Sequence, residues 1–598
     1  MTPASQSPRP GATTQRTQYC GSLRASDAGQ TVRLGGWVHR PRDLGGIVFL
    51  DLRDREGIVQ ISFDPRWTPP DVLARAGSVG VETVVLVEGE VAARPPEARN
   101  PDLSTGDIEV RATALRIVGP AVTPAIPVAR GKGEQLPSEE LRLKHRHLDL
   151  RRPELQANLI MRHRLMQVTR RYLSELGFLE IETPILTKPT PEGARDYLVP
   201  SRVHAGEFYA LPQSPQLYKQ LLMVSGLDRY FQIARCFRDE DLRADRQPEF
   251  TQIDIEASFI EREDIMRVAE GLLAVMFSEA GMSAPARFRR MSYADAMERF
   301  GSDRPDLRYG LELFDASDAF SETEFTIARS ALAQGGRVRG IRVPGGATLS
   351  RKQVDELEAV AKSAGAGGVV RLKRGSNGLE GPAAKFLTDG SAERLALVEG
   401  DLALLVADRD HVTSPALDRV RQEVARRMEL VPSGALEFLW VLDFPMFDNQ
   451  GGTLAAMHHP FTSPLPEDLE LLSSAPERVR AVAYDVVLNG TELGGGSVRI
   501  SDPVVQERVF RLLGIDEATA RARFGFLLDG LRSGAPPHGG IAFGFDRIAM
   551  MLAGAASLRD VIAFPKTTAA RALFEGAPSL VPADDLRELH LRLEANGK

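Results

Sequence analysis

Two alternating runs that flank a highly charged loop constrain this chain more than any other feature. The runs span residues 229–237 and 250–257, and alternate side chains of a strand share one face. One face of the second run carries Phe250 and then three polar residues, Gln252, Asp254 and Glu256. A polar row in the middle of a large globular chain predicts a strand and loop that bind a small, highly charged ligand. A solvated edge hairpin is the alternative, and the hairpin alone does not exclude it.

The length of the chain and its two cysteines limit what it can be. With 598 residues it is too long for one hydrophobic core, so two to four domains are expected. Its composition, 43% hydrophobic and 26% charged, is that of an ordinary soluble globular protein. Cys20 and Cys236 cannot form a disulfide framework or a zinc site made only of cysteine, and a reducing cytoplasm is the expected location. No apolar run approaches the roughly 18 residues that a membrane helix needs, so no membrane partner is expected.

The first quarter of the chain concentrates positive charge behind a polar tail. Residues 1–16 are rich in Pro, Ser and Thr, lack the apolar core of a secretory signal, and predict a disordered tail. The net charge of −7 argues against a general nucleic-acid binder but leaves a local basic patch open. Five arginines against three aspartates lie within residues 33–55, and five basic residues against one acid lie within residues 142–152.

Residues 17–120 predict an all-β domain. Five short runs rich in β-branched residues alternate with Gly, Pro or Asp turns, which favours a small closed barrel of the OB type. Barrels of this type commonly bind oligonucleotides on one face, and a purely structural barrel is the alternative. Residues 121–150 are expected to form a linker or hinge. Residues 154–176 then predict an amphipathic helix. The segment FLEIETPIL that follows alternates like a strand that ends at Pro184.

A glycine-rich stretch of mixed helix and strand character spans residues 288–420. It predicts an inserted α+β domain, because sheet-like sequence resumes at residues 436–448. Its own sequence offers no recognisable site.

Two further segments carry residues suited to anions or metals. A helix over residues 213–226 presents Lys219, which could bind an anion, although a solvated lysine is the simpler interpretation. Residues 491–500 form a strand-like run whose three glycines let a ligand come close and whose Arg499 offers a planar fork for a carboxylate. A β-bulge with a surface arginine is the alternative there. Asp485 and Glu492 are hard oxygen ligands that could share a Mg²⁺ ion.

A strand, a glycine turn and a helix are predicted over residues 538–554. Arg547 lies in the first turn of that helix, where a cation opposes the helix dipole, so it needs an anionic partner. That partner is either its neighbour Asp546 or a triphosphate. His458 and His459 lack the spacing of a zinc site, and hydrogen bonding to a substrate or phosphate is the preferred interpretation.

These segments resemble the class II aminoacyl-tRNA synthetases. FRDEDLRADRQPEFTQID resembles the second signature motif of that family, GFDRIAMMLAG the third, and FLEIETPIL the first, which in the family helps to build the dimer. The segments QSPQLYKQ, TPEGARDY, MHHPFT and GGGSVRI are similar to those of aspartyl-tRNA synthetases, and the barrel and the insertion resemble the bacterial form.

The resemblance implies a fold, an activity and partners. The fold is a multidomain α/β and β chain, with an OB-fold barrel, a class II catalytic domain built on an antiparallel sheet with flanking helices, and the inserted α+β domain. The activity is attachment of aspartate to tRNA-Asp in two steps, with ATP as substrate and Mg²⁺ as cofactor, in a cytoplasmic homodimer. The implied domain ranges are 1–16 for the tail, 17–120 for the anticodon-binding barrel, 121–150 for the linker, 151–287 and 421–560 for the catalytic domain, 288–420 for the insertion and 561–598 for a C-terminal extension.

The resemblance also implies roles for individual residues. The catalytic residues would be Arg238, Glu492 and Arg547. The aspartate-binding residues would be Glu192, Asp196, Ser214, Gln216, Lys219, Gln252, Asp254, His458 and Arg499. The ATP-binding residues would be Arg238, Asp239, Glu240, Gln247, Phe250, Glu492, Gly544, Phe545, Asp546 and Arg547. Phe49 and Gln60 would read the anticodon, and Asp485 and Glu492 would hold Mg²⁺.

Several rival interpretations make different predictions. Lys219 with Arg499, together with the large insertion, argues against synthetases for asparagine or lysine. A non-catalytic RNA-binding relative should have lost Arg238, Glu492 or Arg547, and all three are present. An OB-fold binder joined to an unrelated enzyme does not explain the order of the motifs. An enzyme that also charges tRNA-Asn is the remaining alternative, and Leu44 resembles the restricted form.

Overall fold

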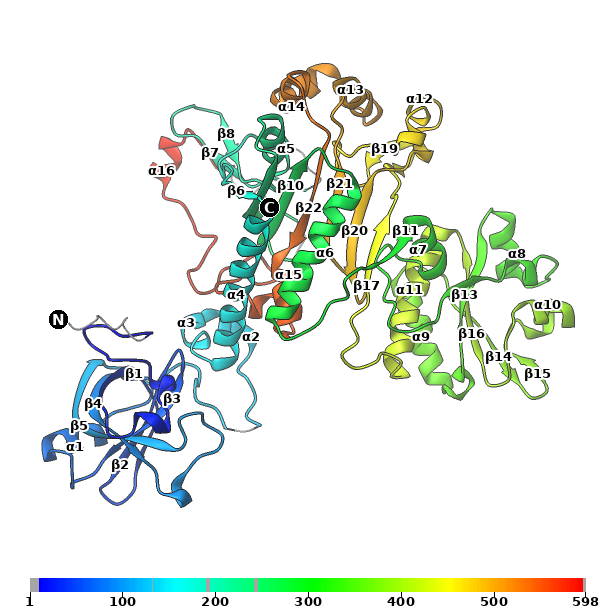
Figure 1. The fold of residues 1–598 in the computed structure, drawn as a ribbon. Coiled ribbons are helices and arrows are strands. Elements are labelled where there is room, and N and C mark those ends of the chain that lie inside the picture. Colours follow the sequence, from blue (N-terminus) through cyan, green and yellow to red (C-terminus); the bar gives the residue numbers. More distant parts are fainter. Residues whose placement is uncertain (1–9, 132, 190–193, 241–245, 595–598) are drawn as a thin grey trace. The chain divides into compact units, whose positions relative to one another are not determined.

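The computed structural model describes residues 10–131, 133–189, 194–240 and 246–594, shown in Figure 1. They divide into two compact units. The first contains Met1–His163, Leu242–Gln247 and Ala553–Val581, and the second contains Arg164–Asp241, Pro248–Leu552 and Pro582–Lys598.

The first unit contains a closed five-stranded barrel in the order β1-β2-β3-β5-β4. Leu34, Leu50, Ile61 and Val110 fill its interior and have no exposed surface, as expected where alternate side chains of each strand point inward. The predicted OB-fold barrel is confirmed. Its elements are β1 (Thr31–Asp43), β2 (Val48–Asp54), β3 (Gly57–Phe63), α1 (Pro70–Gly77), β4 (Val84–Ala93) and β5 (Ile108–Gly119).

The stretch after the barrel carries two short helices, α2 (Glu139–Lys144) and α3 (Arg146–Asp149), within the range expected to be a linker. Arg146 is buried, and its guanidinium donates hydrogen bonds to the carbonyl oxygens of Arg559, Ile562 and Ala563 at 2.6–2.8 Å. Asp149 receives a fourth bond from Arg146 at 2.7 Å. This stretch is therefore fixed to a segment from the far end of the chain.

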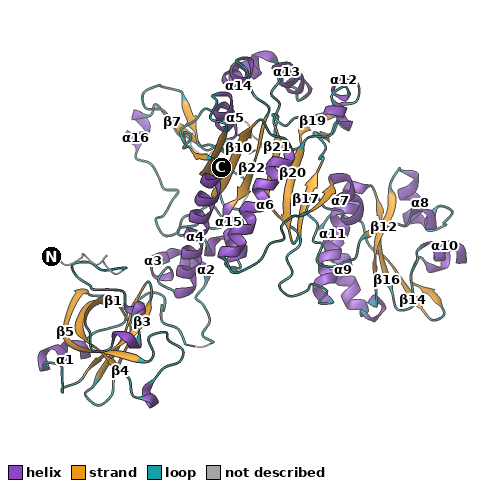
Figure 2. Ribbon diagram, in the orientation of Figure 1, coloured by secondary structure: helices purple, strands orange, loops and turns teal. Residues whose placement is uncertain are grey.

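The second unit is built on an eight-stranded sheet in the order β11-β17-β20-β21-β22-β10-β9-β6, seen in Figures 1 and 2. Its central pairs are antiparallel, and Ile253 of β10 lies opposite Ile233 of β9. The two predicted strands are confirmed, as is the antiparallel catalytic sheet. The strands are β6 (Leu179–Glu180), β9 (Arg229–Phe237), β10 (Glu249–Ser258), β11 (Arg289–Ser292), β17 (Phe438–Leu442), β20 (Ala483–Leu488), β21 (Thr491–Val498) and β22 (His538–Gly544).

Helices flank this sheet. Figure 1 shows α6 lying across it, and α15 follows directly from β22. Leu217 of α5 packs with Phe510 of α13 and Phe524 of α14 in a separate apolar cluster. Helix α4 (Pro153–Glu175) begins within the residues of the first unit and ends within those of the second. The other helices are α5 (Gln216–Val224), α6 (Arg262–Glu279), α7 (Tyr293–Phe300), α12 (Leu471–Ser474), α13 (Pro503–Leu512), α14 (Glu517–Arg532), α15 (Phe545–Leu552) and α16 (Ala583–Glu588). Two small hairpins complete the unit, β7 (Leu198–Pro200) with β8 (Phe208–Ala210), and β18 (Phe447–Gln450) with β19 (Thr453–Ala456).

The strand predicted at FLEIETPIL is much shorter than its alternating pattern suggests. Only Leu179 and Glu180 pair, in parallel with β9, at the edge of the sheet. Leu179, Ile185 and Leu186 are each about half exposed, at 49, 50 and 53%. The alternation of the first motif thus reflects an apolar surface rather than an extended strand.

The insertion is an α+β arrangement, as predicted. Its sheet runs β12-β13-β16-β14-β15 with every pair antiparallel, and an apolar cluster covers each face. One strand inside residues 288–420, β11, pairs instead with β17 of the catalytic sheet. The elements are β12 (Leu313–Asp315), α8 (Thr326–Ala333), β13 (Arg337–Val343), α9 (Arg351–Ser363), β14 (Val370–Gly375), β15 (Gly378–Glu380), α10 (Asp389–Arg394), β16 (Leu402–Asp408) and α11 (Asp410–Arg427).

Among the described residues, the structure has no helix of sufficient length and apolar character to cross a membrane.

Candidate active site

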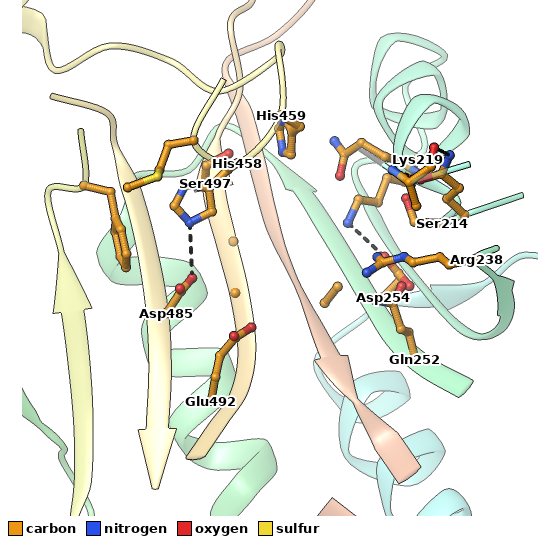
Figure 3. Close-up of a pocket in the computed structure, with 18 of the residues that line it drawn as sticks. Ser214, Lys219, Arg238, Gln252, Asp254, His458, His459, Asp485, Glu492 and Ser497 are labelled. Atoms are coloured by element: carbon orange, nitrogen blue, oxygen red, sulfur yellow. Dashed lines mark hydrogen bonds and ion pairs between the residues drawn. The ribbon is translucent and has the colours of Figure 1, made fainter. Parts of the chain in front are cut away.

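A cavity of about 530 Å³ opens on the second unit, where β10, β20 and β21 meet α5. In Figure 3, His458, Asp485 and Glu492 form one group, and Lys219, Asp254 and Arg238 form another on the far side of β22. The polar row of β10 therefore faces a pocket and not bulk solvent. The predicted residues that line the cavity are Ser214, Gln216, Lys219, Arg238, Glu240, Gln252, Asp254, His458, Asp485, Glu492 and Arg499.

Four buried charged residues, two basic and two acidic, form one end of the pocket. Lys219 Nζ lies 3.0 Å from Asp254 Oδ1 and 3.5 Å from Glu256 Oε2. Arg499 makes a two-pronged pair with Glu256, with Nε to Oε1 at 2.9 Å and Nη2 to Oε2 at 3.0 Å. All four residues are at most 3% exposed. The cations expected to grip a substrate carboxylate are thus already held in place by two acids of the chain.

The two acids of this quartet differ in their electrostatics. Burial raises the pKa of Asp254 above its ordinary value, against the charge of Lys219. Burial alone would also raise the pKa of Glu256, but the charges of Arg499 and Lys219 outweigh it and hold that pKa low. Asp254 Oδ2 is buried and accepts no hydrogen bond within the chain. A buried acceptor without a partner is costly, so this oxygen is suited to an ammonium group of a ligand.

His459 completes the surroundings of Arg499. Its Nε2 lies 2.8 Å from Arg499 Nη1. Arg499 Nη1 also donates to Ser497 Oγ at 2.6 Å. Because arginine can only donate, Nε2 must carry a lone pair, and the ring is neutral. Burial and the charge of Arg499 lower the pKa of His459 well below its ordinary value, which agrees with that assignment.

Gln216 and Gln252 line the same end of the pocket. Gln216 Nε2 is buried and donates to no group of the chain, which leaves a donor available to a ligand. Gln252 Oε1 lies 3.2 Å from Cys236 Sγ on the neighbouring strand. Ser214 Oγ accepts from the backbone N–H of Gln216 at 3.3 Å, at the start of α5. Serine is a favoured cap residue, and a cap at Ser214 predicts a helix that starts at residue 215, whereas α5 begins at Gln216, one residue later.

Carboxylates form the other end of the pocket. His458 Nε2 lies 3.6 Å from Asp485 Oδ1, an ion-pair distance that is too long for a hydrogen bond. The pKa of His458 lies above its ordinary value, because the charge of Asp485 outweighs the lowering by burial. Burial and the charge of Asp485 raise the pKa of Glu492. Two carboxylates thus lie close to one imidazole here.

This end fits a hard divalent cation. Asp485 Oδ1 is buried and accepts no hydrogen bond. A side chain at Gly495 would place its Cβ 2.4 Å from that oxygen, so only glycine leaves room beside it. Among the described residues, no three His, Cys, Asp or Glu side chains converge closely enough to ligate one ion together. Asp485 and Glu492 would therefore supply one or two oxygens, and Mg²⁺ typically keeps water and phosphate oxygens at its other positions.

Arg238 and Arg547 approach the pocket from β9 and α15. The Arg238 guanidinium lies over the ring of Phe250, 5.1 Å from its centroid, and its Nε is buried without a hydrogen-bond partner. Arg547 donates from Nη1 to the carbonyl oxygen of Glu492. Two guanidinium groups are thus positioned for a phosphate or a base, although Arg547 itself does not line the cavity.

Some expected ATP contacts have other roles in the structure. Phe545 has no exposed surface, so its ring packs in the core. Asp546 Oδ2 accepts the backbone N–H of Thr251 at 2.8 Å and ties α15 to β10. In the first unit, the carboxamide of Gln247 pairs with the backbone of Lys566 in both directions, at 2.9 and 3.0 Å.

Three further predicted contacts do not line the cavity. Asp239 and Gly544 belong to the second unit and do not line it. Asp196 accepts a 2.5 Å hydrogen bond from Gln213 Nε2, and Gln213 does line it. Glu192 lies outside the described residues.

The barrel carries its own cavity of about 380 Å³. Phe49, Gln60 and the 66% exposed Leu44 line it, together with Arg42 and Trp67. Gln60 accepts from Arg42 Nη2 at 3.2 Å. An aromatic face beside arginines suits single-stranded nucleic acid.

Sequence reasoning gives no individual role to three residues of the catalytic pocket and its walls. Glu256 shares a strand face with Asp254, and that spacing could have assigned it. The segment MHHPFT does not separate His459 from its neighbour His458. Asp303 lines the pocket but lies 182 residues before Asp485 in the chain, and no local pattern links the two.

Comparison with known proteins agrees with this geometry. The sequence profile of the family described as "tRNA synthetases class II (D, K and N)" matches residues 138–568, and that of the "OB-fold nucleic acid binding domain" matches residues 32–118. An "Aspartate--tRNA(Asp/Asn) ligase" from Caldanaerobacter subterraneus subsp. tengcongensis is 51% identical over 97% of this chain and 98% of that protein. An "Aspartate--tRNA ligase" from Bacillus licheniformis is 51% identical over 97% of this chain and 99% of that protein.

The chain belongs to the aspartate–tRNA ligase family of class II tRNA synthetases.

Solved structures of class II synthetases share the fold of this aspartate–tRNA ligase family member. The asparaginyl-tRNA synthetase from Pyrococcus horikoshii complexed with asparaginyl-adenylate has a TM-score of 0.58 at 20% identity, covering 92% of this chain and 98% of its own. The aspartyl-tRNA synthetase from Entamoeba histolytica has a TM-score of 0.56 at 19% identity, covering 91% of this chain and 90% of its own.

Proposed function

We propose that the protein activates L-aspartate with ATP to form aspartyl-adenylate and then transfers the aspartyl group to the terminal adenosine of tRNA-Asp. The observation that carries this proposal is the buried quartet of Lys219, Asp254, Glu256 and Arg499 in one pocket with Arg238 and the carboxylates of β20 and β21. The quartet offers sites for the charged groups of an acidic amino acid. The other end offers a place for a metal-bound triphosphate.

Aspartate recognition would use the geometry of the quartet. Lys219 and Arg499 would bind the side-chain carboxylate, and the open Oδ2 of Asp254 would accept the ammonium group. The quartet holds two positive and two negative charges, and the side-chain carboxylate and ammonium group of aspartate add one of each, so the total stays neutral. Asparagine would present an amide N–H₂ group to Lys219 and Arg499. Both side chains can only donate hydrogen bonds, so hydrogen-bond donors would face each other without an acceptor. Unpaired buried polar groups of this kind can give large discrimination.

The first chemical step needs no activated nucleophile of the protein. An oxygen of the aspartate α-carboxylate attacks the α-phosphorus of ATP, the bond to the bridging oxygen breaks, and pyrophosphate leaves. Arg238 would stabilise charge on the α-phosphate, and positioning of the reactants supplies much of the acceleration. Mg²⁺ held by Asp485 and Glu492 would neutralise charge on the departing pyrophosphate.

The second step transfers the aspartyl group to RNA. The terminal ribose hydroxyl of the tRNA attacks the carbonyl carbon of the adenylate, and AMP leaves. In the barrel, Phe49 would stack on an anticodon base, and Gln60 would read a base edge. Relatives named "Aspartate--tRNA(Asp/Asn) ligase" favour a second candidate function, in which the protein also charges tRNA-Asn with aspartate. Leu44, which is exposed and lines the barrel cavity, resembles the residue of the restricted form at this position.

The assembly we propose is a homodimer located in the cytoplasm. Leu179, Ile185 and Leu186 form an exposed apolar surface at the β6 edge of the sheet. Exposed apolar surface of this kind is typical of protein interfaces.

Aminoacylation with the purified protein tests the function and its breadth. Labelled aspartate would be incubated with ATP, Mg²⁺ and either tRNA-Asp or tRNA-Asn. Charging of tRNA-Asp alone supports the restricted enzyme, and comparable charging of both supports the relaxed one. The absence of aspartate-dependent pyrophosphate exchange would overturn the proposal.

A further inference from the structure

A loop at the base of the insertion reaches the catalytic pocket. Residues 301–312 connect α7 to β12, and Asp303 within this loop lines the cavity with Asp485, Glu492 and His458. The sequence pattern assigns no role to Asp303. This residue lies in the connection that leads from α7 to β12, away from the catalytic sheet. What holds this loop therefore determines where Asp303 points.

Arg421 of α11 holds the loop from the side of the insertion. Its side chain is fully buried, and its guanidinium lies 4.8 Å from the ring centroid of Phe300 and 4.5 Å from that of Tyr309. At 2.5–3.3 Å it donates to four carbonyl oxygens of the loop, those of Asp306, Tyr309, Gly310 and Leu311. One arginine of the insertion thus fixes most of the loop, and a lysine could not reproduce this fork.

The loop also packs against the hairpin that carries the metal-binding candidates. A Cβ at Gly490, in the turn between β20 and β21, would lie 3.2 Å from the Cβ of Asp306. A Cβ at Gly301 would lie 2.5 Å from the carbonyl oxygen of Ser414 in α11. The side chain of Asp306 pairs with Arg308 at 2.6 Å. The loop is therefore held between α11 of the insertion and the β20–β21 hairpin.

Three carboxylates face this end of the pocket. They are those of Asp303, Asp485 and Glu492, and their basic neighbours are His458, Arg304 and Arg547. Yet no three such groups of the described residues converge closely enough to bind one ion directly. A carboxylate at this position can act on a hydrated ion through the ion's water molecules, because Mg²⁺ keeps several of them.

We propose that Asp303 binds the hydration shell of the Mg²⁺–ATP complex, and that the insertion positions it through Arg421. Asp303 is then a further binding residue of the reaction, and Arg421 is a positioning residue. The inference rests on the proposed function, because it assumes that Asp485 and Glu492 hold Mg²⁺ with ATP. It gives the insertion a role in activation that does not require contact with tRNA.

The first test measures metal dependence separately from aspartate binding. For wild type and D303N, the Mg²⁺ concentration giving half-maximal pyrophosphate exchange is compared with the aspartate dissociation constant from calorimetry without ATP. Binding of Mn²⁺ with ATP is followed by electron paramagnetic resonance. Loss of an outer-shell partner typically costs 10- to 100-fold in metal affinity, so we expect about a tenfold weaker Mn²⁺ response in D303N with aspartate binding unchanged. E322Q, an exposed carboxylate of the insertion, is the matched control.

The inference would be overturned if D303N bound Mn²⁺ and depended on Mg²⁺ as the wild-type protein does. If the wild-type protein itself shows no response to Mn²⁺ with ATP, the proposed function fails first. Equal weakening of metal and aspartate binding in D303N would indicate general damage to the pocket and would also overturn it.

The second test examines whether Arg421 acts through Asp303. R421K should weaken Mn²⁺ binding in the same direction, and D303N/R421K should be no weaker than D303N, because coupled residues are not additive. Additive losses in the double variant would contradict the positioning role. If R421K does not fold, the D303N measurement decides the assignment of Asp303, and R426M on the exposed side of α11 shows whether the helix tolerates loss of an arginine.

Discussion

Arg499 and Glu256 form a two-pronged ion pair with no more than 3% of either residue exposed. They lie 243 residues apart in the chain, with Glu256 on β10 and Arg499 just beyond β21. Glu256 also faces Lys219 at 3.5 Å, so this carboxylate orients both cations proposed to bind aspartate. Recognition of an acidic substrate is thus arranged by an acid of the protein itself.

Replacing Arg499 by leucine should nearly abolish aspartate activation. The change removes one proposed carboxylate ligand and leaves Glu256 as a buried charge with only Lys219 as partner. Breaking a buried pair from one side costs about 3–5 kcal/mol. We expect kcat/KM for pyrophosphate exchange to fall by a factor that corresponds to this free energy, mainly through a higher KM for aspartate. R532L removes an arginine from an exposed pair with Glu507 and should change little. Wild-type exchange in R499L would contradict the assignment.

Replacing Phe49 by alanine should weaken tRNA charging and leave tRNA-independent exchange intact. Stacking of a base on an aromatic ring contributes about 1–3 kcal/mol, which corresponds to roughly 5- to 150-fold in the KM for tRNA. The exchange assay on the same preparation is the control. Equal losses in both assays would argue against an anticodon role for the barrel cavity.

Replacing Gly495 by alanine should raise the Mg²⁺ requirement. The new Cβ would lie 2.4 Å from Asp485 Oδ1, so the carboxylate must move. We expect at least a tenfold rise in the half-saturating Mg²⁺ concentration in the exchange assay, with the aspartate dissociation constant unchanged. The matched control is G525A in α14, where the new Cβ finds its nearest neighbour at an ordinary 3.5 Å. An unchanged Mg²⁺ requirement in G495A would show that Asp485 does not hold the ion.

Replacing Asp418 by asparagine should stabilise the protein at neutral pH. Burial raises the pKa of Asp418 to about 6, above its value of 3.8 in the unfolded chain. Between these two values the unfolded chain ionises first, so wild-type stability falls as the pH rises from about 4 to 6 and the penalty persists above 6. The shift corresponds to at most about 3 kcal/mol.

Thermal unfolding at pH 4 and pH 7.5 measures this effect. The melting temperature of D418N should exceed that of wild type more at pH 7.5 than at pH 4. E322Q should shift neither value. A gain that is equal at both pH values would show that ionisation of Asp418 is not the cause.

Replacing Ile185 by aspartate should convert the proposed dimer to a monomer. Ile185 is 50% exposed beside Leu179 and Leu186, and a charge there would have to be buried in the interface. Sedimentation velocity measures the change. I327D introduces the same charge at a 57% exposed isoleucine of the insertion and should leave the oligomeric state unaltered. A monomeric wild-type protein would refute the dimer itself.

Local pattern predicts the strands of this site but not their partners. The alternation of residues 250–257 correctly placed Gln252, Asp254 and Glu256 on one face. It could not show that Glu256 meets Arg499, because that contact depends on the order of β21, β22 and β10 in the sheet. The same limit applies to Asp303, whose position depends on the packing of α11.

Motif resemblance has a different limit, because it does not distinguish a side chain that faces a ligand from one that supports the fold. Phe545 and Asp546 belong to the third motif, yet the ring of Phe545 is fully buried and the carboxylate of Asp546 binds the backbone of β10. At FLEIETPIL the alternation predicted a strand, but only two residues found a neighbouring strand to pair with.

The hydrogen bonds of Arg146 have a consequence for synthesis of the chain. Three of its acceptors belong to residues 413 to 417 positions further along. The barrel can close as soon as β5 leaves the ribosome, but the buried guanidinium of Arg146 then has no carbonyl oxygens to bind until almost the entire polypeptide has been translated. The segment after the barrel must therefore wait, incompletely folded, while the catalytic sheet and its insertion are made.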